Sequence, residues 1–480
     1  MFSNRWRWPK KLFLLFSFFL IAFFGTRILS NKFHTLLSFI YYLTFPSQLP
    51  VTTFVKKEHL VSGTATPWAP IFSHLYSCPV CFGYGMCNEV MKDSVLFHGE
   101  LSMAHNTKIM WKKGVLRTQR ILISSLVTEE WNKFDEFICR NASQTIPCDL
   151  SAAIWKTVFA NSNLLSTENF RNLNALLDIP LSQLALPVCS STKLLSELTK
   201  SFDENFDGHF SGEEKILLLT SLVMQPGYVI LKLQAKTKMT MPIPNLLGAC
   251  GRSVILEGGL KPLKSFLSES FDARAGLAIQ VLQLVEDFEE EDPQWYFIYL
   301  GFSLDGIFVT KEGEVVVMDL DNIVILDKSS FTTDSFKLSS HTGLCNEVCF
   351  QKITLELLYY PNNSSCNFIS EYGLLMYAVV CKQVLSNIAE HRAEGFFNFD
   401  GYRIHRKQEN PGLLHSIPHK IKERMEDLLR ECVQETKLNG RRKAITELRD
   451  MLENYVNIND SNGHSSYENT PFWTYKKNSK

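Results

Sequence analysis

The sequence predicts an α+β fold with two lobes, and three observations lead to this expectation. The 480-residue chain has room for a two-lobed domain of about 300 to 380 residues together with terminal appendages. A β-hairpin is predicted at 307–318, where two β-rich runs flank Gly313, because glycine supplies the positive φ of a short loop. Leucine and isoleucine recur at helical spacing in later stretches, which predicts amphipathic helices at 371–388, 413–432 and 441–455.

The composition indicates a globular protein with disulfides and argues against a nucleic-acid-binding protein. The formal net charge is -1 with 21% charged residues, so we expect no nucleic-acid partner. The hydrophobic share of 45% is enough for a sizeable core. Twelve cysteines, an even number, favour disulfides in an oxidising compartment. Cys381 lies in an apolar helical run and is the best candidate for a buried free thiol.

The first 70 residues predict a membrane anchor followed by a stem. Basic residues precede an uncharged apolar run at 12–25, and the basic flank of an anchor stays in the cytosol. The run is short for a spanning helix of about 20 residues, but no convincing cleavage site follows it. We therefore expect a cytosolic tail at 1–11, a signal-anchor transmembrane helix at 12–29 and a stem at 30–70. The alternative is cleavage of the leader, which gives a secreted protein.

Sequons and cysteines are consistent with a lumenal domain. The sequons lie at Asn141, Asn362, Asn363 and Asn459. Disulfide candidates are Cys78, Cys81, Cys87, Cys139, Cys148, Cys189, Cys345, Cys349 and Cys366. The spacing of the first two also suits a zinc site, but no second ligand pair completes it. We expect the first three cysteines to pair with distant ones, among them Cys139, Cys148 and Cys189.

Residues 203–214 fit the twelve-residue loop of an EF-hand. Gly208 permits the sharp turn, and apolar spacing predicts flanking helices at 192–202 and 213–224. The sequence therefore predicts a Ca²⁺ site, with an acidic surface turn as the alternative. The expected ligands are Asp203, Asn205, Asp207, His209 through its carbonyl, Ser211 and Glu214.

The stretch 296–327 and its flanks resemble a known family. Asp319 ends the second strand of the hairpin, as the metal-binding aspartate does in protein kinases. The stretch 296–327, the segment 248–252 and the Cys-Pro-Val-Cys-Phe-Gly sequence at 78–83 together resemble sequences of the divergent protein-kinase-domain family. That family is a cysteine-rich, secretory-pathway group which includes the deleted-in-autism proteins.

The resemblance runs from Cys78 to Tyr455 and implies a bilobal protein-kinase-like fold. The implied arrangement is a cysteine-rich small lobe at 71–256, an EF-hand unit at 191–224 inserted in it, a large lobe at 257–456 and a disordered tail at 457–480.

The resemblance also implies a degenerate phosphoryl-transfer site. Kinases use a lysine and its partner glutamate, a base aspartate, and an asparagine and an aspartate for the metal. The corresponding positions here are Ser124, Glu130, Gly301, Gly306 and Asp319, in that order. Asp319 is the expected ligand of Mg²⁺ or Mn²⁺ with ATP, if any binds. Nearby substitutes are Asp305, Asp321, Lys232 and Lys236.

The missing lysine, base and asparagine predict a pseudokinase. We expect a type II protein of the endoplasmic reticulum or Golgi membrane, with a calcium-responsive lumenal module that binds an unknown client or enzyme. One alternative is an active atypical kinase in which Asp319 with Asp305 or Asp321 carries the metal. Another is a secreted signalling ligand.

Overall fold

The computed structural model describes much of the region that the sequence assigns to the two lobes. The described residues are 77–92, 95–101, 108–159, 191–237, 239–292, 294–299, 301–330, 369–386 and 411–461. Among them, no helix is long and apolar enough to cross a membrane. The segments predicted at 1–70 lie outside the described residues, as do four candidate cysteines and two sequons: Cys189, Cys345, Cys349, Cys366, Asn362 and Asn363.

A five-stranded antiparallel sheet forms the first part of this region, in the order β1-β2-β3-β5-β4. The central strand β3 is buried from Ile121 onward, as expected for a short continuous apolar run. Its Ser124 lies opposite Trp111 on β2 and Val254 on β5. The strands are β1 (Leu96–Leu101), β2 (Ile109–Leu116), β3 (Gln119–Leu126), β4 (Leu246–Cys250) and β5 (Ser253–Glu257).

Helices fill the long connection between β3 and β4. The helix α9 packs against both α7 and α8 and is buried from Pro226 to Leu233. Most residues in this stretch are apolar, and a helix of this kind is stable only when other elements surround it. The helices are α3 (Thr128–Asn141), α4 (Leu150–Ile154), α7 (Thr192–Phe202), α8 (Gly212–Met224) and α9 (Pro226–Lys236), while α2 (Cys87–Lys92) precedes the sheet.

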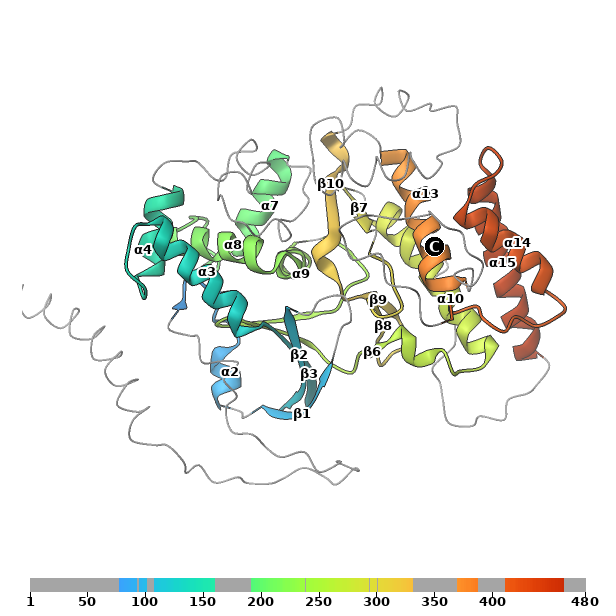
Figure 1. Cartoon of the computed structure of the whole chain (residues 1–480), viewed down its shortest axis with the longest axis horizontal. Helices are drawn as coiled ribbons and strands as arrows, with labels where there is room; N and C mark the ends of the chain where they lie inside the picture. The colour runs from blue at the N-terminus through green and yellow to red at the C-terminus, as the bar shows by residue number, and fades with distance from the viewer. Residues whose placement is uncertain are drawn as a thin grey trace, which may run out of the picture. The chain divides into compact units, whose positions relative to one another are not determined.

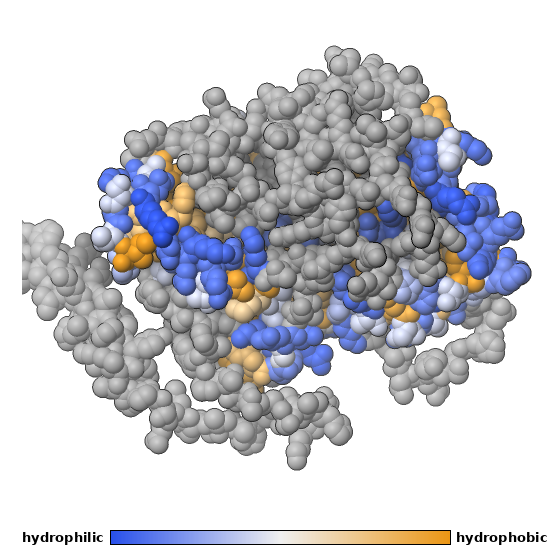
Figure 2. Space-filling model, viewed as in Figure 1, coloured by the Kyte–Doolittle hydropathy of each residue, from blue (hydrophilic) through white to orange (hydrophobic). Residues whose placement is uncertain are grey.

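The second part of the region combines two small sheets with a helical group. The sheets are β6 (Lys261–Pro262) with β8 (Ile307–Val309) and β9 (Val315–Val317), and β7 (Trp295–Tyr299) with β10 (Ile323–Asp327). The helices α10 (Phe271–Glu286), α13 (Ile369–Val380), α14 (Lys422–Val433) and α15 (Gly440–Ser461) pack on one another (Figure 1). Hydrophilic residues predominate on the visible side of α14 and α15, with some hydrophobic ones among them (Figure 2). Arg424 of α14 and Glu447 of α15 form an exposed ion pair.

The predicted elements agree with the structure except at some ends. The hairpin is confirmed as β8 and β9, and Gly313 in its turn has φ +89°. The helix predicted at 413–432 begins only at Lys422, because Pro418 lacks an N–H group and disfavours helix before it. In contrast, α15 continues to Ser461, where a disordered tail was predicted from 457. Packing against α10 and α14 stabilises this helix more than its intrinsic propensity does.

The disulfides correct three expectations about cysteines. The zinc alternative is wrong, since Cys78 and Cys81 are bonded to each other. Cys87 pairs with a distant cysteine as expected, and its partner is Cys250. Cys139 and Cys148, two of the named distant candidates, are instead bonded to each other, and Cys381 is not a free thiol. The described disulfides are Cys78–Cys81, Cys87–Cys250, Cys139–Cys148 and Cys381–Cys432.

The two disulfides near the start of the described region differ in the length of chain they close. Loop-closure entropy gives about 5 kcal/mol for Cys87–Cys250 but only about 2 kcal/mol for Cys78–Cys81, because their sequence separations are 163 and 3. The first therefore ties the N-terminal segment to the sheet, whereas the second is a local link.

Candidate functional site

The predicted calcium loop lies between α7 and α8, as the sequence indicated. Its turn is formed by Gly208, whose φ is +74° and whose N–H donates to Asp203 Oδ2 at 3.0 Å. The N–H of His209 donates to Asp207 Oδ1 at 2.7 Å. These bonds give the segment a compact helix–loop–helix shape.

Glu214 holds the two ends of this loop together. Its Oε1 accepts from the N–H of Glu204 at 2.9 Å, and its Oε2 accepts from the N–H of Ser211 at 2.7 Å. The Ser211 hydroxyl accepts from the N–H of Glu214 in return, which completes a capping box at the start of α8. Glu214 is only 2% exposed.

The donor set of the loop suits calcium, whose ligands are oxygens. Asp203 Oδ1 is buried without a hydrogen-bond partner, and each carboxylate oxygen of Glu214 has a further lone pair. Asn205, Asp207 and His209 are exposed. Among the described residues, however, the structure gathers no group of three acidic, histidine or cysteine side chains around one point.

A buried lysine connects the loop with α9. Lys232 is 3% exposed, forms an ion pair with Glu204 and lies 4.1 Å from the ring centroid of Phe202. Burial lowers the pKa of this ammonium group, and Glu204 opposes that shift. Lys232 therefore binds Glu204 in the loop, and it does not replace the missing kinase lysine. Lys236 lies over the ring of Phe206 at 4.4 Å.

The first turn of α9 joins β3 to the segment after Asp319. Ser124 is fully buried, and its hydroxyl accepts from Gln225 Nε2 at 2.7 Å. Two residues later, the N–H of Gly227 donates to Asp321 Oδ1 at 2.9 Å. In protein kinases the corresponding strand carries a lysine that pairs with a glutamate on the helix beside the metal-binding segment.

Glu130, the expected partner glutamate, forms ion pairs with two lysines. Glu130 lies on α3 and pairs with Lys133 at 2.9 Å and with Lys108 at 3.6 Å. The hydrogen bond from Lys133 lowers the pKa of this carboxyl group although burial acts against it. The residue bonded to Ser124 is Gln225, and sequence reasoning missed it because 101 positions separate the two. The available signal was the Gln-Pro pair that starts a largely apolar helix.

Gly301, Gly306 and Asp319 lie together around Tyr299. The Tyr299 hydroxyl donates to Gly301 O at 2.9 Å, and a Cβ atom on Gly301 would stand 2.9 Å from the tyrosine ring. A Cβ atom on Gly306 would lie 3.6 Å from Asp319 Cβ. Burial, followed by the charges of Asp319 and Asp321, raises the pKa of Tyr299. An aspartate at position 301 therefore has no room beside this ring.

Asp305, an expected substitute for the base, pairs with Lys264 at 3.6 Å. Both side chains are partly exposed, so this is a surface pair.

A small cavity lies between β2, β5, α9 and the segment after Asp319. It leaves about 20 Å³ for the centres of water-sized molecules, which is room for about one water or one small ion. Trp111 Nε1 and Gln225 Oε1 line it and are buried without hydrogen-bond partners, and Asp319 and Asp321 add carboxylates. Carboxylate and amide oxygens suit Mg²⁺.

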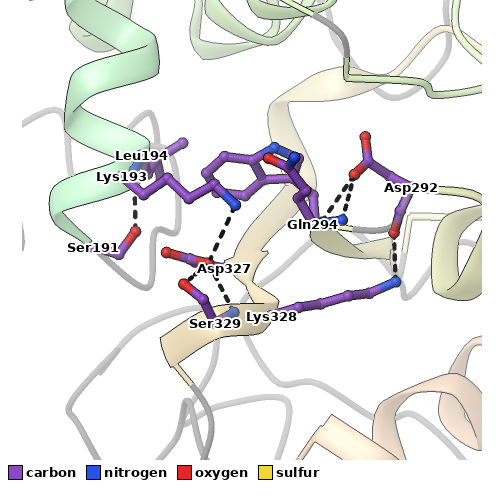
Figure 3. Close-up of polar contacts among 9 residues, drawn as sticks. Ser191, Lys193, Leu194, Asp292, Gln294, Asp327, Lys328 and Ser329 are labelled. Atoms are coloured by element: carbon purple, nitrogen blue, oxygen red, sulfur yellow. Dashed lines mark hydrogen bonds and ion pairs between the residues drawn. The ribbon is translucent and has the colours of Figure 1, made fainter.

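A second polar contact joins α7 to β7 and β10 (Figure 3). Lys193 lies 3.9 Å from Asp327 and 4.8 Å from the centroid of Trp295. Burial alone raises the pKa of Asp327, but hydrogen bonds from Ser329 and Ser191 and the charge of Lys193 together lower it. The helix α7, which precedes the loop 203–214, thus contacts the strands β7 and β10 through Lys193.

The chain is similar to a family of kinase-like proteins. Residues 219–435 match the family model described as the protein-kinase domain of FAM69. The chain is 27% identical over 410 residues to Divergent protein kinase domain 2A of Xenopus tropicalis, covering 80% of this chain and 88% of that protein. The human counterpart is 26% identical over 417 residues, with the same two shares of 80% and 88%. Divergent protein kinase domain 2B of Mus musculus is 24% identical over 336 residues, covering 66% of this chain and 73% of that protein.

Proposed function

The chain belongs to the divergent protein-kinase-domain family, and we propose that it acts as a pseudokinase that binds a protein partner without transferring phosphate. One observation carries the proposal: Ser124 bonds Gln225 at 2.7 Å where kinases pair a lysine with a glutamate. A hydroxyl and an amide supply no cation for nucleotide phosphates. The phosphate charge is therefore unmatched at this point.

The other positions support the same proposal. Gly301 supplies no base, and the ring of Tyr299 fills the space that a side chain there needs. Gly306 supplies no amide oxygen for a second metal ion. A module of this kind acts through its surface, by holding a client protein or an enzyme.

We propose that the loop 203–214 binds Ca²⁺ and thereby stabilises this module. Glu214 and Asp203 are the central ligands, because they supply a buried carboxylate and a buried oxygen without a hydrogen-bond partner. The proposed setting is the lumen of the endoplasmic reticulum or Golgi, with the N-terminal segment as the anchor. Asn141 at the end of α3 is exposed, and its sequon is consistent with glycosylation there.

One observation favours a second candidate, an atypical active kinase. Asp319 and Asp321 line the same cavity as Gln225 Oε1, so three oxygen-bearing side chains are available for a divalent cation.

Thermal melting of the full chain tests both candidates. A ligand that binds the folded state raises stability by about 2.7 kcal/mol at a hundredfold excess over its Kd. We expect a rise in Tm with Ca²⁺ that Glu214→Gln abolishes, and no rise with Mg²⁺-ATP or Mn²⁺-ATP. A metal-dependent ATP shift that disappears in Asp319→Ala contradicts the pseudokinase and supports the second candidate.

A further inference from the structure

We propose that Cys78 and Cys81 form a redox-active disulfide that exchanges with a pair of thiols in a peptide or protein substrate. This activity is separate from the kinase-like site. The two residues are bonded to each other in a Cys-Pro-Val-Cys sequence. Pairs with this spacing support thiol–disulfide exchange, because a reactive sulfur and a resolving sulfur stay within reach of each other.

The two sulfurs differ in their access to solvent. Cys78 is partly exposed at the outer end of the loop, whereas Cys81 is 0% exposed. A substrate thiolate must reach the sulfur that it attacks. Cys78 is therefore the residue attacked, and Cys81 is the leaving group. In the neighbouring disulfide both cysteines, Cys87 and Cys250, are buried.

The loop that carries the pair is held in place by contacts other than the disulfide. The N–H of Val80 donates to Ser77 O at 2.8 Å, and Arg252 Nε donates to Val80 O at 3.2 Å. The N–H of Phe82 donates to Gly251 O at 2.9 Å, and the side chain of Phe82 is fully buried. These bonds remain when the sulfurs separate, so the reduced loop keeps its shape.

The disulfide also constrains little of the chain. Its sequence separation is 3, compared with 9, 51 and 163 for the other described disulfides. Stabilisation by a disulfide grows with the length of the loop that it closes. Reduction of Cys78–Cys81 is therefore the least costly to the fold, and this is the property that a reversible disulfide needs.

The proposed exchange is balanced within the two reactants. A substrate thiolate attacks Cys78 Sγ, the Cys78–Cys81 bond breaks, and Cys81 leaves as a thiolate. The second substrate thiol then attacks the substrate sulfur of this mixed disulfide, and Cys78 leaves. The substrate loses two electrons and forms a disulfide, the protein pair is reduced, and the two substrate protons pass to the protein thiolates.

The test incubates the full oxidised chain with a synthetic peptide that contains two cysteines. Free thiols are alkylated over time and located by mass spectrometry. We expect one equivalent of peptide disulfide to form while Cys78 and Cys81 become alkylated, with the other described disulfides intact. The Cys78→Ser/Cys81→Ser chain should oxidise the peptide at least tenfold more slowly.

The matched control is Cys139→Ser/Cys148→Ser, which removes another short-range disulfide and leaves no unpaired thiol at that site. It should oxidise the peptide at the wild-type rate. An intact Cys78–Cys81 bond in the presence of excess peptide overturns the proposal, as does equal activity of the Cys78→Ser/Cys81→Ser chain. If that variant does not fold, the location of alkylation in the wild-type chain decides the question.

Discussion

Glu214 and Gln225 are buried polar side chains at neighbouring helices, but their hydrogen bonds differ. Both carboxylate oxygens of Glu214 accept N–H groups from its own loop, at Glu204 and Ser211. Gln225 bonds Ser124, a residue on a distant strand, and its Oε1 has no hydrogen-bond partner. The loop 203–214 is thus a local unit closed by its own sequence. The kinase-like site is assembled from remote segments and keeps an unused acceptor.

The largest expected effect comes from removing the carboxylate that closes the loop. Glu214→Ala deletes two buried, charge-assisted hydrogen bonds and one helix cap, so we expect a loss of about 2–4 kcal/mol of unfolding free energy. Urea denaturation without added calcium measures this loss. The control is Glu213→Ala at the exposed neighbouring position, where we expect a change below about 0.5 kcal/mol. Equal stability of the two variants contradicts the description of the loop as locally closed.

The second effect concerns the bond that joins β3 to α9. Ser124→Ala leaves the Gln225 amide without its partner, which costs about 1–3 kcal/mol. Adding Gln225→Leu removes the second partner as well. The double-mutant cycle should therefore give a coupling energy of about 1 kcal/mol. Strict additivity means that the two residues do not interact in solution.

The third effect is a change in how the free energy of unfolding depends on pH. Burial lowers the pKa of Lys232 below its ordinary value of 10.5. Between the folded and unfolded pKa values the unfolded chain binds more protons, so this group makes stability rise with pH in that window. Lys232→Met should reduce the rise below pH 10.5 more than Lys236→Met does, because Lys236 is exposed and its charge is a smaller cause of the lowered pKa of Lys232 than burial. Denaturation midpoints across this range measure the slope, and equal slopes in both variants contradict the role of burial.

The smallest expected loss of stability comes from replacing Glu130, whose ion pair should contribute less than the Ser124–Gln225 hydrogen bond. Glu130 pairs with Lys133, which is 68% exposed, and pairs with such exposed partners contribute about 1 kcal/mol or less. Glu130→Gln should therefore lower stability only slightly, and less at high salt, because salt screens the charges. Chemical denaturation at two salt concentrations checks this. A loss as large as that of Ser124→Ala is inconsistent with a weak ion pair to an exposed lysine.

The loop was predictable from sequence because its contacts are local. The spacing of Asp203, Gly208 and Glu214 already indicates the turn and the capping of α8. The hairpin before Asp319 was predictable for the same reason, since Gly313 supplies its positive φ.

The partner of Ser124 was not predictable in this way. Glu130 follows β3 directly and has the expected side chain, but α3 places it beside Lys133. Gln225 reaches Ser124 only after the chain has passed through the calcium loop. Likewise, the obstacle at Gly301 depends on how the ring of Tyr299 folds back. Side-chain periodicity carries no information about such long-range packing.

The most direct test of the central claim is a calorimetric titration of the full chain with Mn²⁺-ATP, with a nucleotide-binding kinase as the positive control. The pseudokinase proposal predicts no saturable binding, because Ser124 and Gln225 supply no cation for the nucleotide phosphates. Saturable binding that is lost in Asp319→Ala contradicts it, and shows that this domain retains a working nucleotide site.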